Sequence, residues 1–432
     1  MTIRDHHGLA LSGASQAGAD KYQQALEAYH CYAGDPVPLL DEAIAESPTF
    51  VMAHVLKAYL HLIASNPEAA AVGVEVFETV RHLPCNDREQ GHIAAIGSML
   101  AGEIRAAQRL LEDVTIAEPR DSLALQVGQL MDFTLGDSRM LRDRIGRALP
   151  HWSRGMPGFH AVQGMLSFGL EETGLYDRAE AAGRLALEIQ PRNGWAKHAV
   201  VHVLEMQGRR AEGVAFLRGD LRNWTEESFF QIHNWWHLAL FHLGLGETEE
   251  VLKLFDGPVF GSRSTMAVDL VDAAAMLWRL HLLGLDVSDR WSDLADLYAP
   301  LPRGQYAFDD AHAMMAFVGA GRQAEADELI AAQHAALSGP GDNAMFVREV
   351  GLPVVQALAA FGKGDYRTAV DLLRGVRSGS ARFGGSHAQR DLIDLTLIES
   401  ARRGGDRSLE AALQAERANA RGQDAAMRLA AE

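Results

Sequence analysis

The chain is organised around two matching segments, 195-WAKHAVVHVLEMQG-208 and 231-QIHNWWHLALFHLG-244. Each segment holds two histidines four residues apart, His198 with His202 and His233 with His237. In a helix this spacing puts both imidazoles of a pair on one face, one turn apart. The step from one pair to the next is 35 residues (198 to 233, 202 to 237), close to the length of one helix–turn–helix repeat. The two pairs are therefore predicted to occupy equivalent places on adjacent repeats.

Helical periodicity runs through nearly the whole chain of 432 residues, which lacks the alternating pattern of strands. Three prolines that end helices, Pro48, Pro119 and Pro191, are 71 and 72 residues apart, or two repeats each. The sequence therefore predicts an all-α solenoid of the tetratricopeptide-repeat type with about eleven helix pairs. We expect the first helix of each pair near residues 21–33, 49–63, 87–101, 121–135, 158–173, 194–207, 228–244, 267–283, 306–319, 344–361 and 383–401.

A solenoid of this length can curl until its ends approach each other, and we expect a toroid-like ring with a central polar pocket. The whole chain, 1–432, is then one domain. We expect residues 1–18 to be a flexible N-terminus and residues 402–432 to form a C-terminal capping helix. An uncapped terminal repeat would expose an apolar face, so self-association into a homo-oligomer is the alternative to such a cap.

Composition narrows the classes of partner. A net charge of −17 without any basic run argues against nucleic acid. The chain has no apolar run long enough to span a membrane, and its start, MTIRDHHGLALSG, lacks the regions of a signal peptide. The two cysteines, Cys31 and Cys85, form neither a disulfide framework nor a metal motif. We therefore expect a cytoplasmic protein that binds neither nucleic acid nor membrane.

Polar residues recur at equivalent places on the expected first helices, which hold thirteen of the 18 histidines. Steps of 35 to 38 residues connect these places along the chain. They are His160, His198, His233, His237, Asp269, Asp272, Asp309, Asp310, His312, Arg348, Glu349, His387, Arg390 and Asp391. In a ring these residues would converge on the central channel. Burying polar groups costs free energy, so an interior with a purely structural role would be expected to be apolar. The alternative is that these histidines are buried core residues that only bond to neighbouring helices.

Acid–base catalysis is one chemistry that these residues could perform, with an imidazole as base and a carboxylate that orients it. The predicted catalytic residues are His202, His237, Asp272, Asp310 and His312. In this scheme Asp272 or Asp310 orients the base, and Arg390 paired with Asp391 holds an anionic group. The predicted substrate-binding residues are His160, Trp236, His387, Arg390 and Asp391.

A divalent metal is the other use of the same helices, because His-x3-His pairs on adjacent helices can surround one ion. Zinc, iron and manganese are the candidates. The predicted ligands are His198, His202, Glu205, His233 and His237. The chain contains neither a His-Glu-x-x-His motif nor a Gly-rich phosphate loop nor a Gly-x-Ser-x-Gly elbow.

Eight strings of the chain, which together span nearly its whole length, resemble the tetratricopeptide repeat protein 38 family. They are ESPTFVMAH (46–54), LSFGLEETGLYD (166–177), KHAVVHVLEMQG (197–208), HNWWHLAL (233–240), VDLVDAAAMLWRL (268–280), DDAHAMMA (309–316), REVGLPVVQA (348–357) and GGSHAQRD (384–391). The resemblance implies that both histidine pairs, Asp272, Asp310, His312, Arg390 and Asp391 belong to the family pattern. His160 and His387 stand where relatives carry other residues. The family supplies no general activity.

Two functions from different classes follow from these residues. The first is an enzyme, a hydrolase that acts on a small polar or amide-bearing molecule in the central pocket, with or without a metal. The second is an interaction scaffold, because helical repeats commonly hold a peptide or protein along a concave groove.

Overall fold

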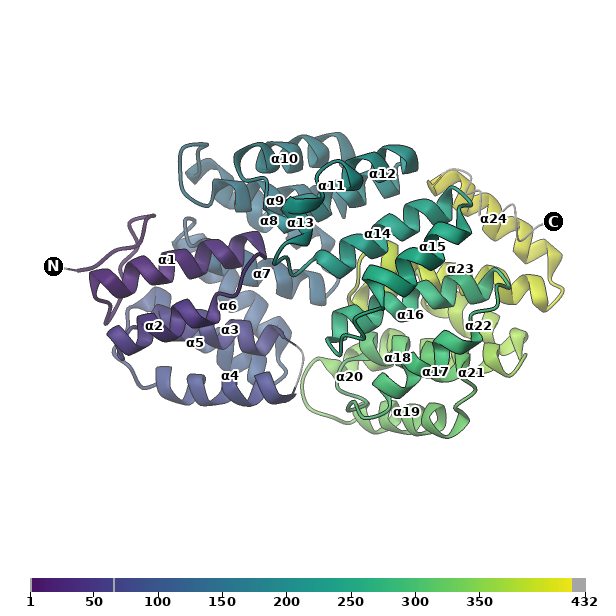
Figure 1. Ribbon diagram of the computed structural model, residues 1–432. Helices are drawn as coiled ribbons and strands as arrows, with labels where there is room; N and C mark the ends of the chain where they lie inside the picture. Colours follow the sequence, from purple (N-terminus) through teal and green to yellow (C-terminus); the bar gives the residue numbers. More distant parts are fainter. Residues whose placement is uncertain (1, 65–66, 422–432) are drawn as a thin grey trace. The chain divides into compact units, whose positions relative to one another are not determined.

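The computed structural model describes residues 2–64 and 67–421, and within these ranges the regular structure is helical apart from two isolated bridges, Arg4 with Ala10 and Ala33 with Ser228. Over these described ranges, eleven helix pairs follow one another, from α1/α2 to α23/α24. Figure 1 shows their order. Each predicted first helix overlaps an observed one, and Pro48, Pro119 and Pro191 follow the ends of α2, α6 and α10. The all-α helical-repeat fold is confirmed. Ring closure and a central channel stay predictions.

Contacts divide the chain into two compact units. The first unit comprises the described residues of Met1–Phe133, Asp137–Val203 and Asp220–Gln231, and the second those of Thr134–Gly136, Leu204–Gly219 and Ile232–Glu432. The helix α11 (Gly194–Met206) contributes residues to both units. The expected domain 1–432 stays a prediction, and each unit is described separately below.

The first unit is built from five helix pairs, the first part of α11 and short segments. Its helices are α1 (Gln16–Cys31), α2 (Val37–Glu46), α3 (Val51–Ile63), α4 (Pro67–Val80), α5 (Asp87–Leu100), α6 (Ile104–Ala117), α7 (Ser122–Thr134), α8 (Ser138–Ala148), α9 (Phe159–Glu171), α10 (Tyr176–Ile189) and α13 (Leu221–Thr225). A 3-10 turn, η1 (Leu149–His151), precedes α9.

Helix α1 contacts parts of the first unit that are distant in sequence. The Gln126 side chain on α7 donates to the Tyr29 carbonyl over 3.0 Å. After α1, the Phe229 N–H donates to the Tyr32 carbonyl over 2.9 Å, and the Gly34 N–H donates to the Glu227 carbonyl over 2.8 Å. The first unit therefore folds back on its own N-terminal helix.

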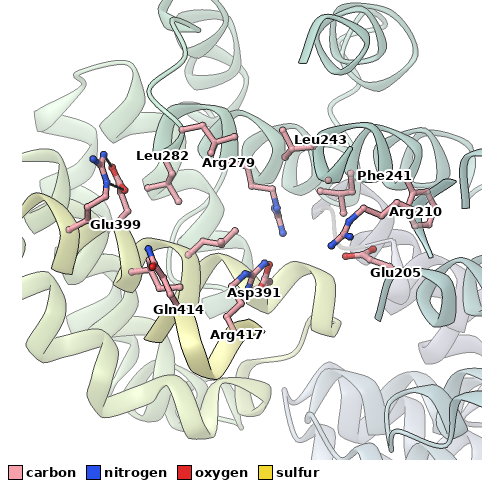
Figure 2. A pocket seen from close by; sticks show the side chains of 16 residues that line it. Glu205, Arg210, Phe241, Leu243, Arg279, Leu282, Asp391, Glu399, Gln414 and Arg417 are labelled. Carbon is pink, nitrogen blue, oxygen red and sulfur yellow. Dashed lines mark hydrogen bonds and ion pairs between the residues drawn. The ribbon is translucent and has the colours of Figure 1, made fainter. Parts of the chain in front are cut away.

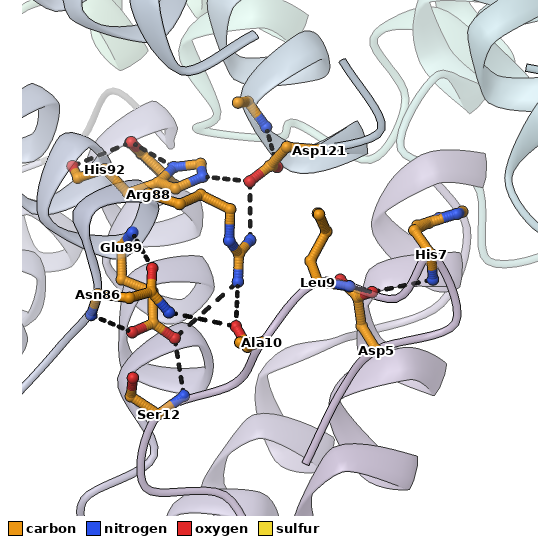
Figure 3. A network of polar contacts seen from close by, with 12 residues as sticks. Asp5, His7, Leu9, Ala10, Ser12, Asn86, Arg88, Glu89, His92 and Asp121 are labelled. Atoms are coloured by element: carbon orange, nitrogen blue, oxygen red, sulfur yellow. Dashed lines mark hydrogen bonds and ion pairs between the residues drawn. The ribbon is translucent and has the colours of Figure 1, made fainter. Parts of the chain in front are cut away.

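The segment before α1 is bonded to α5, although the sequence predicted residues 1–18 to be flexible (Figure 3). The Ser12 N–H donates to the Glu89 carboxylate over 2.9 Å. The Arg88 guanidinium donates to the Ala10 carbonyl over 2.9 Å and to Asp121 over 2.7 Å. Glu89 is fully buried and also closes the capping box of α5 with Asn86. Buried charged side chains on α5 thus bind the backbone at Ala10 and Ser12, and the flexibility expected of residues 1–18 stays a prediction.

The second unit contains the last five helix pairs and α12. Its helices are α12 (Arg210–Arg218), α14 (Gln231–Gly244), α15 (Thr248–Leu254), α16 (Ala267–Leu282), α17 (Ser288–Tyr298), α18 (Ala307–Gly319), α19 (Gln323–Ala336), α20 (Asn343–Phe346), α21 (Leu352–Gly362), α22 (Tyr366–Val376), α23 (His387–Arg403) and α24 (Arg407–Arg421). Shorter helical segments are η2 (Phe255–Val259), η3 (Val347–Gly351) and η4 (Arg377–Phe383).

Two first helices of the second unit, α16 and α23, pack directly on each other. The Trp278 indole N–H on α16 donates to the Thr396 hydroxyl on α23 over 2.8 Å, and the Trp278 side chain is fully buried. The Arg279 guanidinium donates to the Ala388 carbonyl over 2.5 Å. These contacts place α23 against the helices that carry the predicted site residues. Helix α24 lies within the predicted cap 402–432, of which residues 422–432 are outside the described residues.

One helical stretch, Asn343–Gly362, is long and apolar enough to cross a membrane by length and composition. It includes the π-helical turn η3, which lies before Pro353, a residue without an N–H to donate to the preceding turn. Of its most apolar window, 61% is buried, and packing against α18 accounts for part of this burial. That burial is typical of the core helix of a folded unit.

Candidate binding site

The first histidine pair lies in the first unit on α11. The Nε2 atoms of His198 and His202 are 2.8 Å apart, so one imidazole donates to the other. His198 stacks on Phe230 with ring centroids 5.1 Å apart, and both imidazoles are more than nine-tenths buried. The Nδ1 atom of His202 is 3.8 Å from the carboxylate of Glu171, which is also buried. The pair is thus enclosed by aromatic rings and a carboxylate.

The second histidine pair lies in the second unit on α14, and a carboxylate binds each imidazole. The Nδ1 atom of His233 is 2.7 Å from one oxygen of Asp272 and 2.9 Å from the other. The Nδ1 atom of His237 is 2.9 Å from Glu205. Each Nδ1–H therefore donates to a carboxylate, which leaves the lone pair of the neutral ring on Nε2. We expected Asp272 to orient the catalytic base, His202 or His237, whereas its partner in the structure is His233.

Burial governs the protonation of His237 and Asp272. The pKa of His237 is lowered well below its ordinary value by burial, and the nearby His233 and Arg279 lower it further. The pKa of Asp272 is raised by burial, which outweighs the opposing effects of His233 and Arg279. The guanidinium of Arg279 lies over the Trp236 ring, 5.5 Å from its centroid. Trp236, a predicted substrate contact, is fully buried and packs as a core residue.

The predicted catalytic residues of α18 are held by backbone and amide groups. The His312 Nδ1–H donates to the Phe308 carbonyl over 2.9 Å, and burial lowers the pKa of His312 to about 4. Asp310 accepts from the Gly304 N–H over 3.0 Å and from the Gln333 amide over 2.5 Å. Asp310 thus fixes the turn before α18, whereas we expected it to orient a catalytic imidazole.

Two residues with unusual environments, Asp309 and Arg279, were not among the predicted catalytic or substrate-binding residues, although Asp309 was expected in the central channel. The pKa of Asp309 is raised to about 7 by burial and by the adjacent Asp310. Arg279 is 5% exposed and lines the pocket described below. A sequence signal could have identified Arg279. It lies in the string VDLVDAAAMLWRL, seven residues after Asp272, and this spacing puts both residues on one face of the helix.

The predicted anion-binding pair has other partners in the structure. We expected Arg390 to pair with Asp391. Asp391 instead accepts two hydrogen bonds from the guanidinium of Arg417 on α24, one of them over 2.9 Å. The Arg390 guanidinium donates to the Gly385 carbonyl and lies 3.3 Å from Nδ1 of His387. Helix α24 thereby binds α23 at the predicted substrate-binding residue Asp391.

His160, another predicted substrate contact, lies in the first unit and bonds to α1. Its Nε2 atom is 3.0 Å from Glu27. The Asn193 amide nitrogen lies 2.9 Å from His160 Nδ1, while the Asn193 oxygen accepts from the Ala196 N–H. Because the amide nitrogen can only donate, His160 Nδ1 is an acceptor and Nε2 carries the proton that Glu27 accepts.

The group Glu27, Cys31 and His160 has ligand atoms within 4.8 Å of one another, which is a separation that a metal ion could bridge. A histidine ligand normally donates its second ring N–H to an acceptor. Asn193 offers His160 a donor there, so the arrangement does not fit a metal ligand. The thiol of Cys31 also has its pKa raised by burial and by Glu27, which disfavours the thiolate that metals bind.

The second unit contains a pocket of about 140 Å³, called here the leucine pocket (Figure 2). Helices α14, α16 and α23 supply its apolar wall. The apolar lining residues are Leu240, Phe241, Leu243, Leu282, Leu283, Leu395 and Ile398. In Figure 2 the Arg279 side chain points from α16 into the pocket, with Glu205 and Arg210 on one side and the Asp391–Arg417 pair on another.

Two of the predicted site residues, Glu205 and Asp391, line the leucine pocket. The charged residues Arg279 and Arg417, which were not predicted, line it as well. The second unit separately brings together His233, His237, Asp272 and Glu205. The first unit brings together His198 and His202. A metal site that draws on all five predicted ligands stays a prediction, because these residues belong to both units.

Comparisons with known proteins add little to this description. No family model matches the chain, so membership of the tetratricopeptide repeat protein 38 family stays a prediction. One similar solved structure is described as "Structure of Naa15/Naa10 bound to HypK-THB". It is 10% identical, with a TM-score of 0.27, and the match covers 94% of this chain and 64% of that chain. The chain therefore spans less than two thirds of the length of that protein.

Proposed function

We propose that this chain is an interaction scaffold whose second unit holds an apolar side chain of a partner polypeptide in the leucine pocket. The supporting observation is the composition of that pocket, in which leucines form the wall and charged side chains lie around it. An engineered cavity of about 150 Å³ lined by aliphatic side chains binds benzene. A pocket of about 140 Å³ therefore suits one side chain the size of leucine or phenylalanine.

Several charged residues around the leucine pocket have polar partners in the structure. Asp391 binds Arg417, and Glu399 binds Arg402 over 2.7 Å. Glu205 accepts from His237. Because these charges are compensated by their partners, they attract a charged ligand only weakly. The pocket therefore favours an apolar side chain of a partner over a charged one. Burial of one leucine or phenylalanine contributes about 1.5 to 3 kcal/mol to binding.

The histidines of the second unit give less support to catalysis in the pocket. His237 is fully buried and His233 is 5% exposed, and neither lines the leucine pocket. A general base is most effective when its pKa lies near the working pH. The lowered pKa values of His237 and His312 make both imidazoles weak bases.

Peptide selection on the purified full-length chain tests the scaffold. We expect dodecapeptides selected from a displayed random library to share one leucine, methionine or phenylalanine position. The Leu283→Arg variant, which places a charge in the pocket wall, is expected to weaken their binding at least 10-fold in calorimetry, as the loss of an apolar anchor predicts.

The matched control is Leu245→Arg, at an exposed leucine just beyond the end of α14 that does not line the pocket. It should leave peptide binding unchanged. Selected peptides without a common apolar position, or equal binding by the two arginine variants, would refute the scaffold proposal.

A second candidate function is a hydrolase that uses the α14 imidazoles, and the observation that favours it is the pair of carboxylate-bound rings. A carboxylate on Nδ1 orients each ring and leaves the lone pair on Nε2, which is the arrangement that acid–base enzymes use. If this is the function, the Glu205→Gln variant should lose at least 10-fold in kcat/KM on 4-nitrophenyl acetate. The His242→Gln variant is the control. His242 is also on α14, and its Nδ1 atom is likewise bound by a carboxylate, that of Glu247, 2.5 Å away. Equal rates for wild type and both variants would exclude this candidate.

We also propose that the chain belongs to the tetratricopeptide repeat protein 38 family and acts in the cytoplasm. The eight matching strings and their order along the chain support the family, and the composition supports the compartment. A small-molecule substrate and a homo-oligomeric state, both expected from the sequence, remain proposals.

A further inference from the structure

The first unit contains a larger cavity of about 510 Å³, called here the N-terminal cavity. One side is formed by α1, which contributes Asp20, Gln23, Glu27 and His30. The other sides come from His6 and His7 before α1 and from Pro157 and Gly158 before α9. All of these residues belong to the first unit, so the cavity is separate from the leucine pocket.

Several polar atoms around the N-terminal cavity have no hydrogen-bond partner among the described residues. Both ring nitrogens of His30 are buried without a partner, and the residue is only 3% exposed, so water does not replace the missing partners. The Gln23 amide nitrogen and Nδ1 of His7 share this condition. A buried polar group without a partner costs about 1 to 3 kcal/mol, so such groups are uncommon in folded proteins. Several at one cavity indicate a ligand that satisfies them.

The charges around the N-terminal cavity favour a cation. Burial opposes the ionisation of Glu27, but its contact with the ring N–H of His160 and a hydrogen bond from the Gln190 amide outweigh it and hold the pKa of Glu27 at about 2. Asp20 supplies a second carboxylate, and the lining residues include neither Lys nor Arg. Burial lowers the pKa of His30 to about 3, so this imidazole is neutral and offers one donor and one acceptor.

We propose that the N-terminal cavity binds a small organic ammonium ion that also carries a hydroxyl or carbonyl acceptor. The ammonium group donates to the carboxylates of Glu27 and Asp20 and to the lone pair of the His30 ring. The Gln23 amide and the N–H of the His30 ring donate to the acceptor group of the ligand. This arrangement satisfies the buried atoms and offsets the two negative charges at once.

Calorimetry on the full-length chain with three molecules of equal length tests this proposal. The probe is 4-amino-1-butanol, and the controls are 1,4-butanediol, which lacks the ammonium group, and 4-hydroxybutyrate, which carries a negative charge. We expect saturable binding of the amine and at least 10-fold weaker binding of both controls. The Asp20→Asn and Glu27→Gln variants should each weaken amine binding at least 10-fold.

Two further variants separate binding from folding. Asp41→Asn removes an exposed carboxylate of α2 in the same unit and should leave amine binding unchanged. His30→Phe keeps a ring of similar size in the cavity lining but removes the unpartnered nitrogens, so it should abolish binding while the melting temperature stays equal or rises. Absence of saturable amine binding by wild type, equal binding of 1,4-butanediol, or full binding by both carboxylate variants would each overturn the proposal. Binding of the amine does not depend on the scaffold function, and Leu283→Arg should leave it intact.

Discussion

Replacing Asp132 with alanine is expected to lower the free energy of unfolding of the first unit by about 3 to 5 kcal/mol. Asp132 on α7 and Arg144 on α8 are both fully buried and form two bonds, of 2.7 Å and 2.8 Å. The guanidinium packs closely on Gly128, where a Cβ atom would lie 2.8 Å from it. Loss of the carboxylate would leave a buried cation without its counter-ion. Urea unfolding followed by circular dichroism measures the effect.

An exposed ion pair on the same helix provides the control. Arg139 and Asp143 are 3.2 Å apart on α8, and the Arg139 side chain is 83% exposed. Arg139→Ala should cost less than about 1 kcal/mol, because solvent screens such pairs. The double variant Asp132→Leu, Arg144→Met should recover most of the lost stability, since it leaves no charge unpaired. A cost for Asp132→Ala as small as that for Arg139→Ala would contradict the expectation.

The helix pairs could be predicted because each repeat carries its own local signals. Pro48, Pro119 and Pro191 mark helix ends because a proline cannot continue a helix. The repeat period of about 36 residues sets the spacing of the helix pairs. The contacts of α1 with α7 and α9 could not be predicted in this way. A repeat pattern specifies which helices are neighbours along the chain, whereas Gln126 and His160 reach α1 across 97 and 133 residues.

The histidine pairs of the candidate site could also be predicted, but their partners could not. Equivalent positions on adjacent repeats are 35 residues apart, as His198 and His233 show. The observed carboxylate partners are 32 residues apart for His237 with Glu205, and 39 for His233 with Asp272. Glu205 lies three residues after the position equivalent to His237, and Asp272 lies four residues after the position equivalent to His233, so each partner is about one helical turn further along its helix. The packing of adjacent helices decides which turn is used, and one sequence does not reveal it.

Asp309 is a further example, because Asp309 and Asp310 were both expected in the central channel but only Asp310 was predicted to be catalytic. Adjacent residues of a helix point about 100° apart, and the pattern of apolar residues in α18 does not distinguish the two. Asp310 accepts bonds from the Gly304 N–H and the Gln333 amide, whereas Asp309 has its pKa raised to about 7 by burial and by Asp310. The residue with a proton to exchange near neutral pH is therefore Asp309.

Asp309→Asn is expected to stabilise the second unit at pH 8 by about 2 to 4 kcal/mol and to have little effect at pH 4. The pKa of Asp309 is raised in the folded state from 3.8 to about 7, so folding favours the protonated acid. Its contribution to stability is complete below pH 4 and is lost as the pH rises through about 7. Above that pH the folded chain holds a partly buried carboxylate beside Asp310, and asparagine removes this charge.

The measurement is the free energy of unfolding in urea at pH 4.5, 6 and 8 for wild type and variant. The difference between them should grow with pH, because only wild type ionises at this position. Asp327→Asn is the control, since that side chain is 62% exposed and its distance to Lys363 is 3.9 Å. Its effect should be small at every pH, because solvent screens an exposed pair. A gain for Asp309→Asn that is equal at pH 4.5 and pH 8 would show that burial leaves this carboxyl with its ordinary pKa, and that shape alone explains the stabilisation.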